Sequence, residues 1–208
     1  MADRYWILGT GTWDSTSTTN WSASSGGAGG ASVPTASDNV YFDANSNVLA
    51  TAFTVTMANT PRVCNDFTAS GLDGTMTLAG SGIGLTVSGS LTFPATNFTR
   101  TYTGTTTFNA TTTGKTVTTN GVAFGAGVTF NGVGGGWTLG SALTVPTGST
   151  TTTLTNGTLN LASYTLSTGL FNSSNSNTRT IAFGTGQISC TGTGTVWNSS
   201  TVTSLTIT

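Results

Sequence analysis

Residues 107–132 read TFNATTTGKTVTTNGVAFGAGVTFNG, and this stretch decides the fold. The run Thr107–Ala110 (TFNA) returns 22 residues later as Thr129–Gly132 (TFNG), with Asn120-Gly121 midway between them. Leu154–Gly157 (LTNG) repeats the pattern after a longer interval. A spacing of about 20–28 residues is typical of one coil of a β-solenoid, in which each turn of the chain stacks on the previous one. The repeat therefore predicts a parallel β-helix.

Short segments on both sides of this stretch alternate apolar and polar residues with a period of two, which indicates strands. The segments are Val40–Phe42, Phe53–Met57, Met76–Leu78, Leu85–Val87, Leu91–Phe93, Val128–Phe130, Trp137–Leu139, Leu143–Val145, Leu159–Leu161, Tyr164–Leu166, Ile181–Phe183 and Leu205–Ile207. No helical spacing of apolar residues occurs. The chain is thus predicted to be all-β, and a β-sandwich or jelly roll remains the alternative to the solenoid.

Threonine makes up about a quarter of the chain, far above its usual share. In a solenoid, Leu, Val, Ile and Phe would point into a narrow core, and Thr would point outward, where its branched Cβ suits extended backbone and its hydroxyl can reach the next coil. Asn and Gly would form left-handed corners between strands. The run Val202–Thr208 is expected to be a strand with an open edge.

The first 37 residues differ from the rest, so the chain divides into a Trp/Gly-rich amino-terminal cap or docking segment, 1–37, and a repetitive body, 38–208. The segment holds Trp6, Trp13 and Trp21. A solenoid needs atypical terminal units, so these rings are expected to cover the end of the core. The alternative is that they form an exposed sugar-binding platform together with Tyr5 and Tyr41.

The composition argues against an enzyme. The chain has no His and no Glu, and only 5% of its residues are charged. A Ser-His-Asp or Cys-His arrangement is therefore impossible. Asp38 and Asp43 are five residues apart, and Asp66 and Asp73 are seven apart. The two members of each pair would therefore face opposite sides of a continuous strand. All four are expected to occupy turns and strand boundaries. No catalytic, cofactor-binding or metal-binding residue is predicted.

The remaining polar motifs are also expected to be structural. Asp43–Asn47 (DANSN) matches the opening of a calcium loop, but Val48 replaces the required Gly and no Glu is present. Cys64 and Cys190 are far apart and are predicted to be free thiols. Six glycosylation sequons are attributed to the Asn/Ser/Thr-rich composition. They begin at Asn20, Asn97, Asn109, Asn156, Asn172 and Asn198.

The charges are few and unevenly placed. All six acids lie in residues 1–73, whereas residues 74–208 hold Arg100, Lys115 and Arg179 and no acid. Three cations spread over that length are too sparse to displace counterions from a phosphate backbone, so no nucleic-acid binding is predicted. We expect these side chains to be solvated.

Neither a secretory signal nor a membrane span is predicted, because the amino terminus lacks a basic region followed by an apolar run and no segment approaches about 20 consecutive apolar residues. The composition is nevertheless that of an extracellular adhesin. A virus particle reconciles the two observations, because its surface proteins are released by lysis.

The amino-terminal layout carries a resemblance to a known family. It consists of Trp6, Gly9-x-Gly11-x-Trp13, Asn20–Ser22, Pro34 and Asp38–Asp43. This layout resembles the opening module of β-helical proteins of bacterial surfaces and of tailed-phage particles. The Thr/Gly/Asn-rich remainder, including residues 159–166 and 179–181, looks like phage virion proteins with β-rich fibres. The chain lacks the signal peptide and carboxy-terminal barrel of autotransporter passengers, which favours the phage family.

The resemblance implies a non-enzymatic virion structural protein, such as a capsid decoration, head fibre or tail fibre. Its partners would be other virion proteins and copies of itself, and the resemblance also allows a host surface glycan as a partner. The protein would be located in the host cytoplasm before assembly and at the particle surface afterwards. A glycan- or receptor-binding adhesin is the alternative, and a polysaccharide depolymerase using Asp pairs is less favoured.

Overall fold

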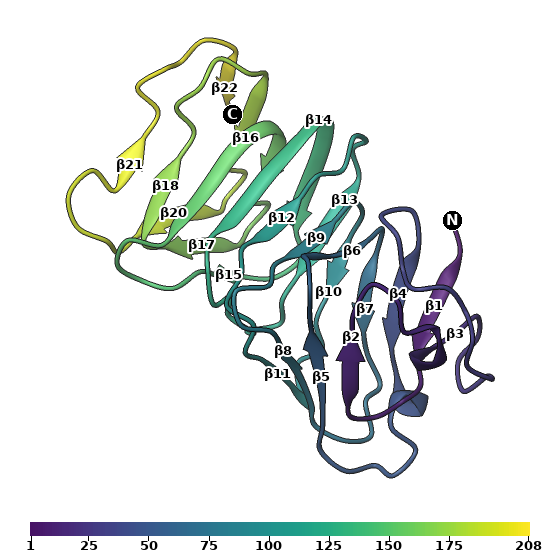
Figure 1. The fold of residues 1–208 in the computed structure, drawn as a ribbon. Coiled ribbons are helices and arrows are strands. Elements are labelled where there is room, and N and C mark those ends of the chain that lie inside the picture. Colours follow the sequence, from purple (N-terminus) through teal and green to yellow (C-terminus); the bar gives the residue numbers. More distant parts are fainter. The chain divides into compact units, whose positions relative to one another are not determined.

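The computed structural model describes residues 1–208 and confirms the predicted fold class. The chain is all-β without an α-helix, and its strands form a parallel β-solenoid of about seven turns (Figure 1). Two short 3₁₀ turns are the only helical elements, η1 (Thr18–Asn20) and η2 (Ala44–Ser46). Strands of successive coils pair in parallel, which rules out the antiparallel sandwich.

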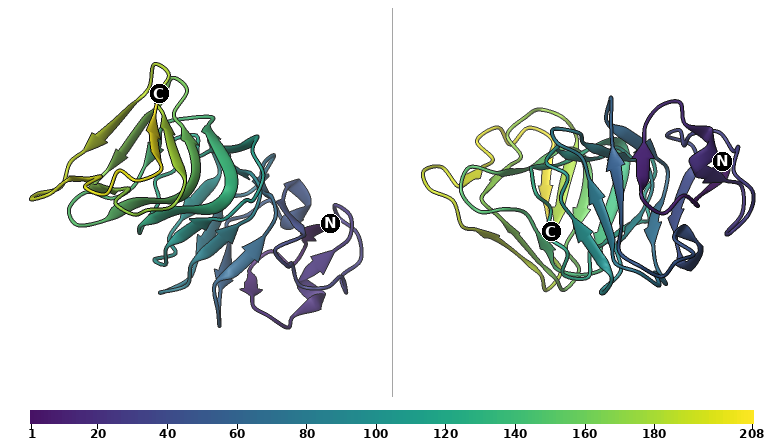
Figure 2. Two further views of the ribbon diagram at one scale, coloured as in Figure 1. Left: turned by 90° about the horizontal axis from the view of Figure 1, so that it is seen from above. Right: turned by 60° about the horizontal axis from the view of Figure 1, so that its bottom comes forward.

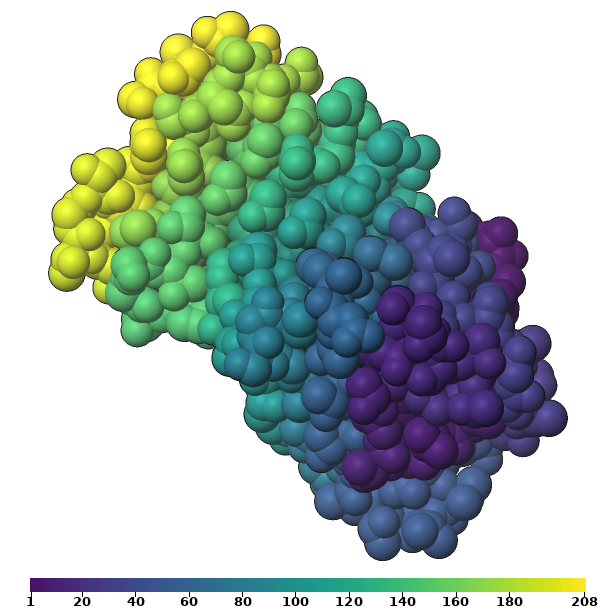
Figure 3. Space-filling view, viewed as in Figure 1, coloured from purple at the N-terminus to yellow at the C-terminus, as the bar shows by residue number.

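Two compact units divide the chain, Met1–Gly104 and Thr105–Thr208. This boundary is distinct from the division at residue 37, which stays a prediction. Within each unit, coils that follow one another in sequence lie beside one another in the ribbon views (Figure 2), and the space-filling surface shows successive bands of colour (Figure 3).

The first unit contains three parallel ladders. The strands of its first ladder are β1 (Asp3–Trp6), β4 (Asn39–Phe42), β7 (Phe67–Ala69) and β10 (Leu91–Thr92). The second contains β2 (Gly11–Trp13), β5 (Phe53–Met57), β8 (Met76–Ala79) and β11 (Phe98–Arg100). In the third, β6 (Arg62–Cys64) pairs with β9 (Leu85–Val87). One antiparallel pair is present, because β3 (Trp21–Ser22) folds back on β1.

The second unit repeats this plan, and two of its strands are long enough to belong to two ladders. These are β14 (Val128–Leu139) and β16 (Thr151–Asn160). The ladder at their amino-terminal ends includes β12 (Thr106–Phe108), β18 (Leu170–Asn172) and β21 (Trp197–Asn198). The ladder at their carboxy-terminal ends includes β13 (Lys115–Thr118), β19 (Arg179–Ala182) and β22 (Leu205–Ile207). The third ladder is β15 (Leu143–Thr144), β17 (Thr165–Thr168) and β20 (Gln187–Cys190).

The sequence repeat corresponds to the structural coil. Phe108 pairs with Phe130, and their rings stack with centroids 5.0 Å apart. Phe130 pairs in turn with Leu154, so the three copies of the repeated motif lie one above another in the same ladder. Thr119 and Ser141 are hydrogen-bonded across 22 residues, as are Thr165 and Gln187 in a later coil.

The alternation of inward apolar and outward polar residues is also confirmed. In β5, Phe53, Val55 and Met57 are buried, while Thr54 and Thr56 lie on the outer face. Thr54 pairs with Thr77, and Thr77 pairs with Thr99, so the outward threonines form a row along the ladder. β-Branched residues in such rows suit the extended backbone and pack on their neighbours.

Asn and Gly occupy left-handed corners as expected. Asn59, Asn97 and Asn120 have positive φ angles, and so do thirteen glycines, among them Gly121 with φ 89°. These conformations carry a smaller steric penalty in Asn and Gly than in other residues.

The amino-terminal tryptophans form the predicted apolar cluster. Trp6, Trp13 and Trp21 have no exposed surface, and Trp21 contacts the other two edge-on at centroid distances of 5.2 Å. Phe42 of the first regular coil lies within 6.3 Å of all three rings and continues the cluster to Phe67. Each large ring thus packs against the next along the core.

The last coil is less well covered than the others. Leu205 and Trp197 are only half-buried, and Ile207 is exposed. The strands β20, β21 and β22 are each paired on one side only. The strand predicted within Val202–Thr208 is therefore confirmed, and its outer edge is unpaired in this structure.

Candidate functional site

Three of the four aspartates considered as acid/base pairs, Asp38, Asp43 and Asp66, accept hydrogen bonds from main-chain N–H groups, and Asp73 lies in a bend before β8. Asp38 accepts from the backbone N–H groups of Ala2 and Thr35 and from the Thr35 hydroxyl. Burial raises the pKa of Asp38, but these hydrogen bonds outweigh burial and hold the pKa below its ordinary value. Asp66 accepts from the backbone N–H of Ser90, which lies in the next coil. Both carboxylates thus connect separate segments.

The calcium-like run is part of a helix cap. The Asp43 carboxylate accepts from the backbone N–H of Asn45 at 2.9 Å, while Ser46 accepts from the Asp43 N–H, which makes a capping box for η2. The Asn47 amide donates to the Thr51 carbonyl. Both cysteines are free, and burial raises the pKa of the Cys64 thiol. No cluster of three or more His, Cys, Asp or Glu side chains is present.

Two arginines are buried, and one of them, Arg179, contradicts the prediction that the cations of residues 74–208 are solvated. Arg179 has no exposed surface and Arg62 has 4%. The prediction is wrong here because neutral oxygens take the place of water. Arg179 donates to the carbonyls of Ser173 and Asn177 at 2.8 and 2.7 Å, and Arg62 donates to the carbonyl of Thr60 at 2.8 Å.

The tryptophans do not form the sugar platform considered as their alternative role. A stacking platform needs an indole face in solvent, and Trp6, Trp13 and Trp21 expose none. Tyr5 and Tyr41 stack on each other at 4.7 Å and are half-buried on the outer side of β1 and β4.

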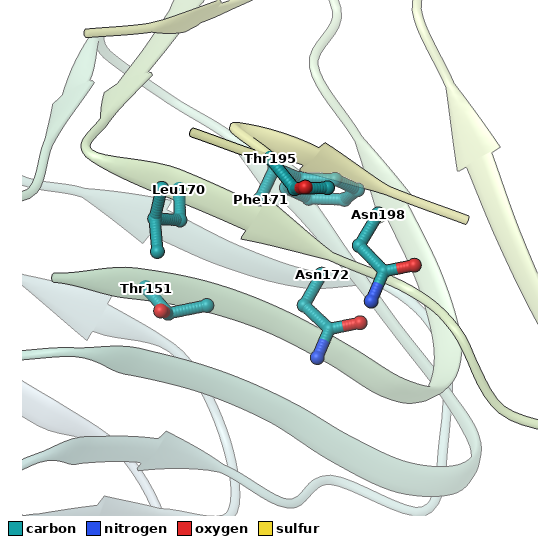
Figure 4. A pocket seen from close by; sticks show the side chains of 6 residues that line it. All are labelled: Thr151, Leu170, Phe171, Asn172, Thr195 and Asn198. Carbon is teal, nitrogen blue, oxygen red and sulfur yellow. The ribbon is translucent and has the colours of Figure 1, made fainter. Parts of the chain in front are cut away.

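A shallow hollow in the second unit is a better candidate for a binding site. Its volume is about 140 Å³, and Figure 4 shows the six side chains around it. Thr151, Leu170 and Asn172 come from β16 and β18, Asn198 comes from β21, and Thr195 lies in the loop before β21; Phe171 completes the lining. The loop bulges because Phe171 pairs with Trp197, 26 residues on, whereas the preceding step of the same ladder, from Thr152 to Phe171, takes 19 residues.

Two parallel amides are the main polar groups of this hollow. Asn172 and Asn198 pair in adjacent strands, and their amide nitrogens point the same way (Figure 4). The side-chain oxygen of Asn172 accepts from the Ser174 N–H, and that of Asn198 accepts from the N–H and hydroxyl of Ser200. These turns fix both amides, and neither NH₂ group has a partner in the protein. The hollow therefore offers two oriented donors beside the apolar Leu170.

Sequence reasoning assigned no function to this pair, although a signal was present. Phe171–Ser174 (FNSS) and Trp197–Ser200 (WNSS) are the same motif one coil apart, and each also contains a glycosylation sequon. Asn20, by contrast, is buried and donates to the Thr12 carbonyl. The remaining sequon residues lie outside the hollow.

No protein-family description, curated protein or solved structure matches this chain. The structure contains no helix that is both long enough and apolar enough to cross a membrane. The fold and the geometry of its surface are therefore the basis for a functional proposal.

Proposed function

We propose that this protein is a non-enzymatic structural protein of a bacteriophage particle, in which it forms a rigid surface element as a capsid decoration, head fibre or tail fibre. The observation that carries the proposal is the solenoid itself, with an apolar core and an outer face of threonine rows. The amino-terminal resemblance to phage and bacterial surface proteins supports the same function.

The mechanism is mechanical. An inner strand such as β16 is hydrogen-bonded to the coils on either side, so its local opening must break two ladders at once. Side-chain bridges between coils add to this, including Asn156 to Asn131 at 2.7 Å and Ser174 to Ser200 at 2.8 Å. A surface built in this way resists proteases, which need an extended and accessible segment.

The proposed partners are other virion proteins and copies of the chain, and the proposed location is the particle surface, after synthesis in the host cytoplasm. A net charge of −1 favours association over repulsion. The unpaired edges of β20, β21 and β22 offer backbone groups that a further strand can pair with.

Analysis of purified particles tests this proposal. We expect quantitative mass spectrometry of gradient-purified virions to find the chain in many copies per particle, and to find it resistant to trypsin there. Particles from a phage with the gene disrupted are the control. Recovery of the chain only from the soluble fraction of infected cells would contradict the proposal.

The second candidate function is a glycan-binding module, and the paired amides of Asn172 and Asn198 are the observation that favours it. Sugar hydroxyls accept hydrogen bonds from fixed amide donors, and an apolar neighbour such as Leu170 covers the C–H groups of a sugar ring. Because both donors are already oriented, little conformational freedom is lost when a sugar binds.

A glycan array distinguishes this function from a purely structural one. We expect Asn172→Asp to reduce any glycan binding about tenfold, since it keeps the turn-forming oxygen but replaces the NH₂ donor. The matched control is Gln187→Glu, the same amide-to-acid change on β20 outside the hollow. Equal binding by Asn172→Asp and Gln187→Glu would refute a role for this hollow.

A further inference from the structure

A second hollow, in the first unit, contains a buried arginine with a free donor. Its volume is about 310 Å³, and it is bordered by residues that follow β2, precede β4 and begin β6. Its lining includes Ser15, Pro34, Thr35, Thr60, Pro61 and Arg62. This volume lies at the lower end of the roughly 300–1,000 Å³ that small-molecule sites occupy.

The guanidinium of Arg62 is held in place from one side only. Its Nε donates to the Thr60 carbonyl at 2.8 Å, and its Nη2 donates to the Thr60 hydroxyl. Its Nη1 has no hydrogen-bond partner in the protein. The buried polar atoms without a partner are the indole nitrogens of Trp21 and Trp137, so Nη1 is not buried and remains accessible. Arg62 is only 4% exposed and lines the hollow, and it keeps one charged donor without a protein partner.

The charges around Arg62 favour a ligand with a single negative charge. Burial lowers the pKa of Arg62, and the negative charge of Asp14 partly offsets this. Asp14 is occupied with its own turn, since its carboxylate accepts from the backbone N–H groups of Thr16 and Ser17 and from the Ser17 hydroxyl. The Ser17 hydroxyl and these two N–H groups lower the pKa of Asp14 to about 2, so Asp14 stays ionised and disfavours a dianion.

The walls of the hollow suit a small polar ring. Ser15, Thr35 and Thr60 contribute hydroxyls, whereas Pro34 and Pro61 contribute rigid apolar surface. The wall at Thr35 is fixed, because the Asp38 carboxylate accepts from its N–H at 3.0 Å and from its hydroxyl at 2.7 Å. A ring that carries both hydroxyls and a carboxylate satisfies all of these groups.

We propose that this hollow binds one carboxylated sugar unit, such as a uronic acid, with its carboxylate on Nη1 of Arg62 and its hydroxyls on Ser15, Thr35 and Thr60. Binding is non-covalent and does not depend on the particle assignment or on the amide pair in the second unit. The site gives the first unit a preference for acidic over neutral saccharides.

Nuclear magnetic resonance of the arginine side chains of the intact chain tests the site directly. The chain has four arginines (Arg4, Arg62, Arg100 and Arg179), so four Nε signals are expected. Titration with sodium D-glucuronate should shift the Arg62 signal in a saturable way and leave the Arg179 signal unchanged. D-Glucose should produce no such shift, and acetate should bind about tenfold more weakly than glucuronate, since it lacks the hydroxyl contacts.

Variants show which groups are responsible. Asp14→Asn should tighten glucuronate binding several-fold, because it keeps the oxygen that caps the turn but removes the competing charge. Arg62→Met should weaken binding about tenfold or more, and Arg100→Met is the matched control. Should Arg62→Met fail to fold, Ser15→Ala replaces it, with weaker glucuronate binding expected and acetate binding unchanged. An unmoved Arg62 signal at saturating glucuronate, or equal binding of acetate and glucuronate, would overturn the proposal.

Discussion

Replacing Trp13 by alanine should lower the free energy of unfolding of the first unit by about 3–5 kcal/mol, the range expected when a large buried ring is deleted. Trp13 has no exposed surface and lies 5.2 Å from Trp21 and 6.3 Å from Phe42. Its neighbours are held by β1, β3 and β4, so they cannot collapse into the space that the ring leaves. The loss therefore includes a cavity cost as well as the lost transfer free energy.

The measurement is urea unfolding of wild type and variant, with hydrogen exchange to assign the change to residues 1–104. Trp197→Ala is the matched control, because Trp197 is half-buried and stacks on Phe171 alone. A smaller loss of about 1–2 kcal/mol is expected there, in keeping with partial burial. Equal losses for the two variants would show that the amino-terminal cluster is no better packed than the last coil.

The parts of the fold that follow a simple period were predictable from sequence. The strands β5, β9 and β22 have the bounds that alternation predicts, because each begins and ends on an inward apolar residue or a corner. The 22-residue repeat predicted the length of this coil correctly, because the aromatic ring of each TFN motif stacks on the ring in the previous coil. The final Gly of the motif has a separate reason. A Cβ on Gly132 would lie 1.7 Å from the Ala110 carbonyl oxygen of the previous coil.

The strands and sites that sequence reasoning missed depend on contacts between coils. β6 begins with Arg62, which points inward. From the sequence alone an arginine is expected to be solvated, and only the folded chain shows that it is buried and hydrogen-bonded to Thr60. The amide pair depends on a coil that is longer than its neighbours, which brings Asn198 beside Asn172. The Arg62 arrangement has no recognisable sequence motif, because its partner Thr60 lies in an irregular loop. The amide pair has the repeated FNSS and WNSS motif, but its spacing of 26 residues departs from the 22-residue repeat.

Arg179 is the clearest case of such a contact and the second residue at which a large effect is expected. Its guanidinium is fully buried, and it donates to four backbone carbonyls, those of Ser173, Asn177, Thr201 and Thr203, and to the Ser173 hydroxyl. These acceptors belong to the corner between β18 and β19 and to the corner between β21 and β22. One side chain therefore holds two successive coils together.

No acid follows Asp73 in the sequence, so the second unit has no acidic side chain to neutralise this cation. Burial lowers the pKa of Arg179, which reflects the cost of removing its charge from water. The carbonyl dipoles offset that cost, as hydrogen bonds to a charged group are worth more than neutral ones. Since no carboxylate takes part, the contribution of Arg179 should stay constant between about pH 4 and 9, unlike that of an ion pair.

Arg179→Met should therefore destabilise the second unit by about 3 kcal/mol or more, because methionine fills part of the space but leaves several carbonyls without a donor. Arg179→Lys should recover only part of the loss, since one ammonium cannot reach acceptors on both corners. Arg4→Met, at a partly exposed arginine of the first unit, should change the free energy of unfolding by less than about 0.5 kcal/mol. Hydrogen exchange should show the loss first in residues 170–208. Unchanged protection there in Arg179→Met would mean that water replaces the guanidinium at these carbonyls, and that the outer coils are held by their ladders alone.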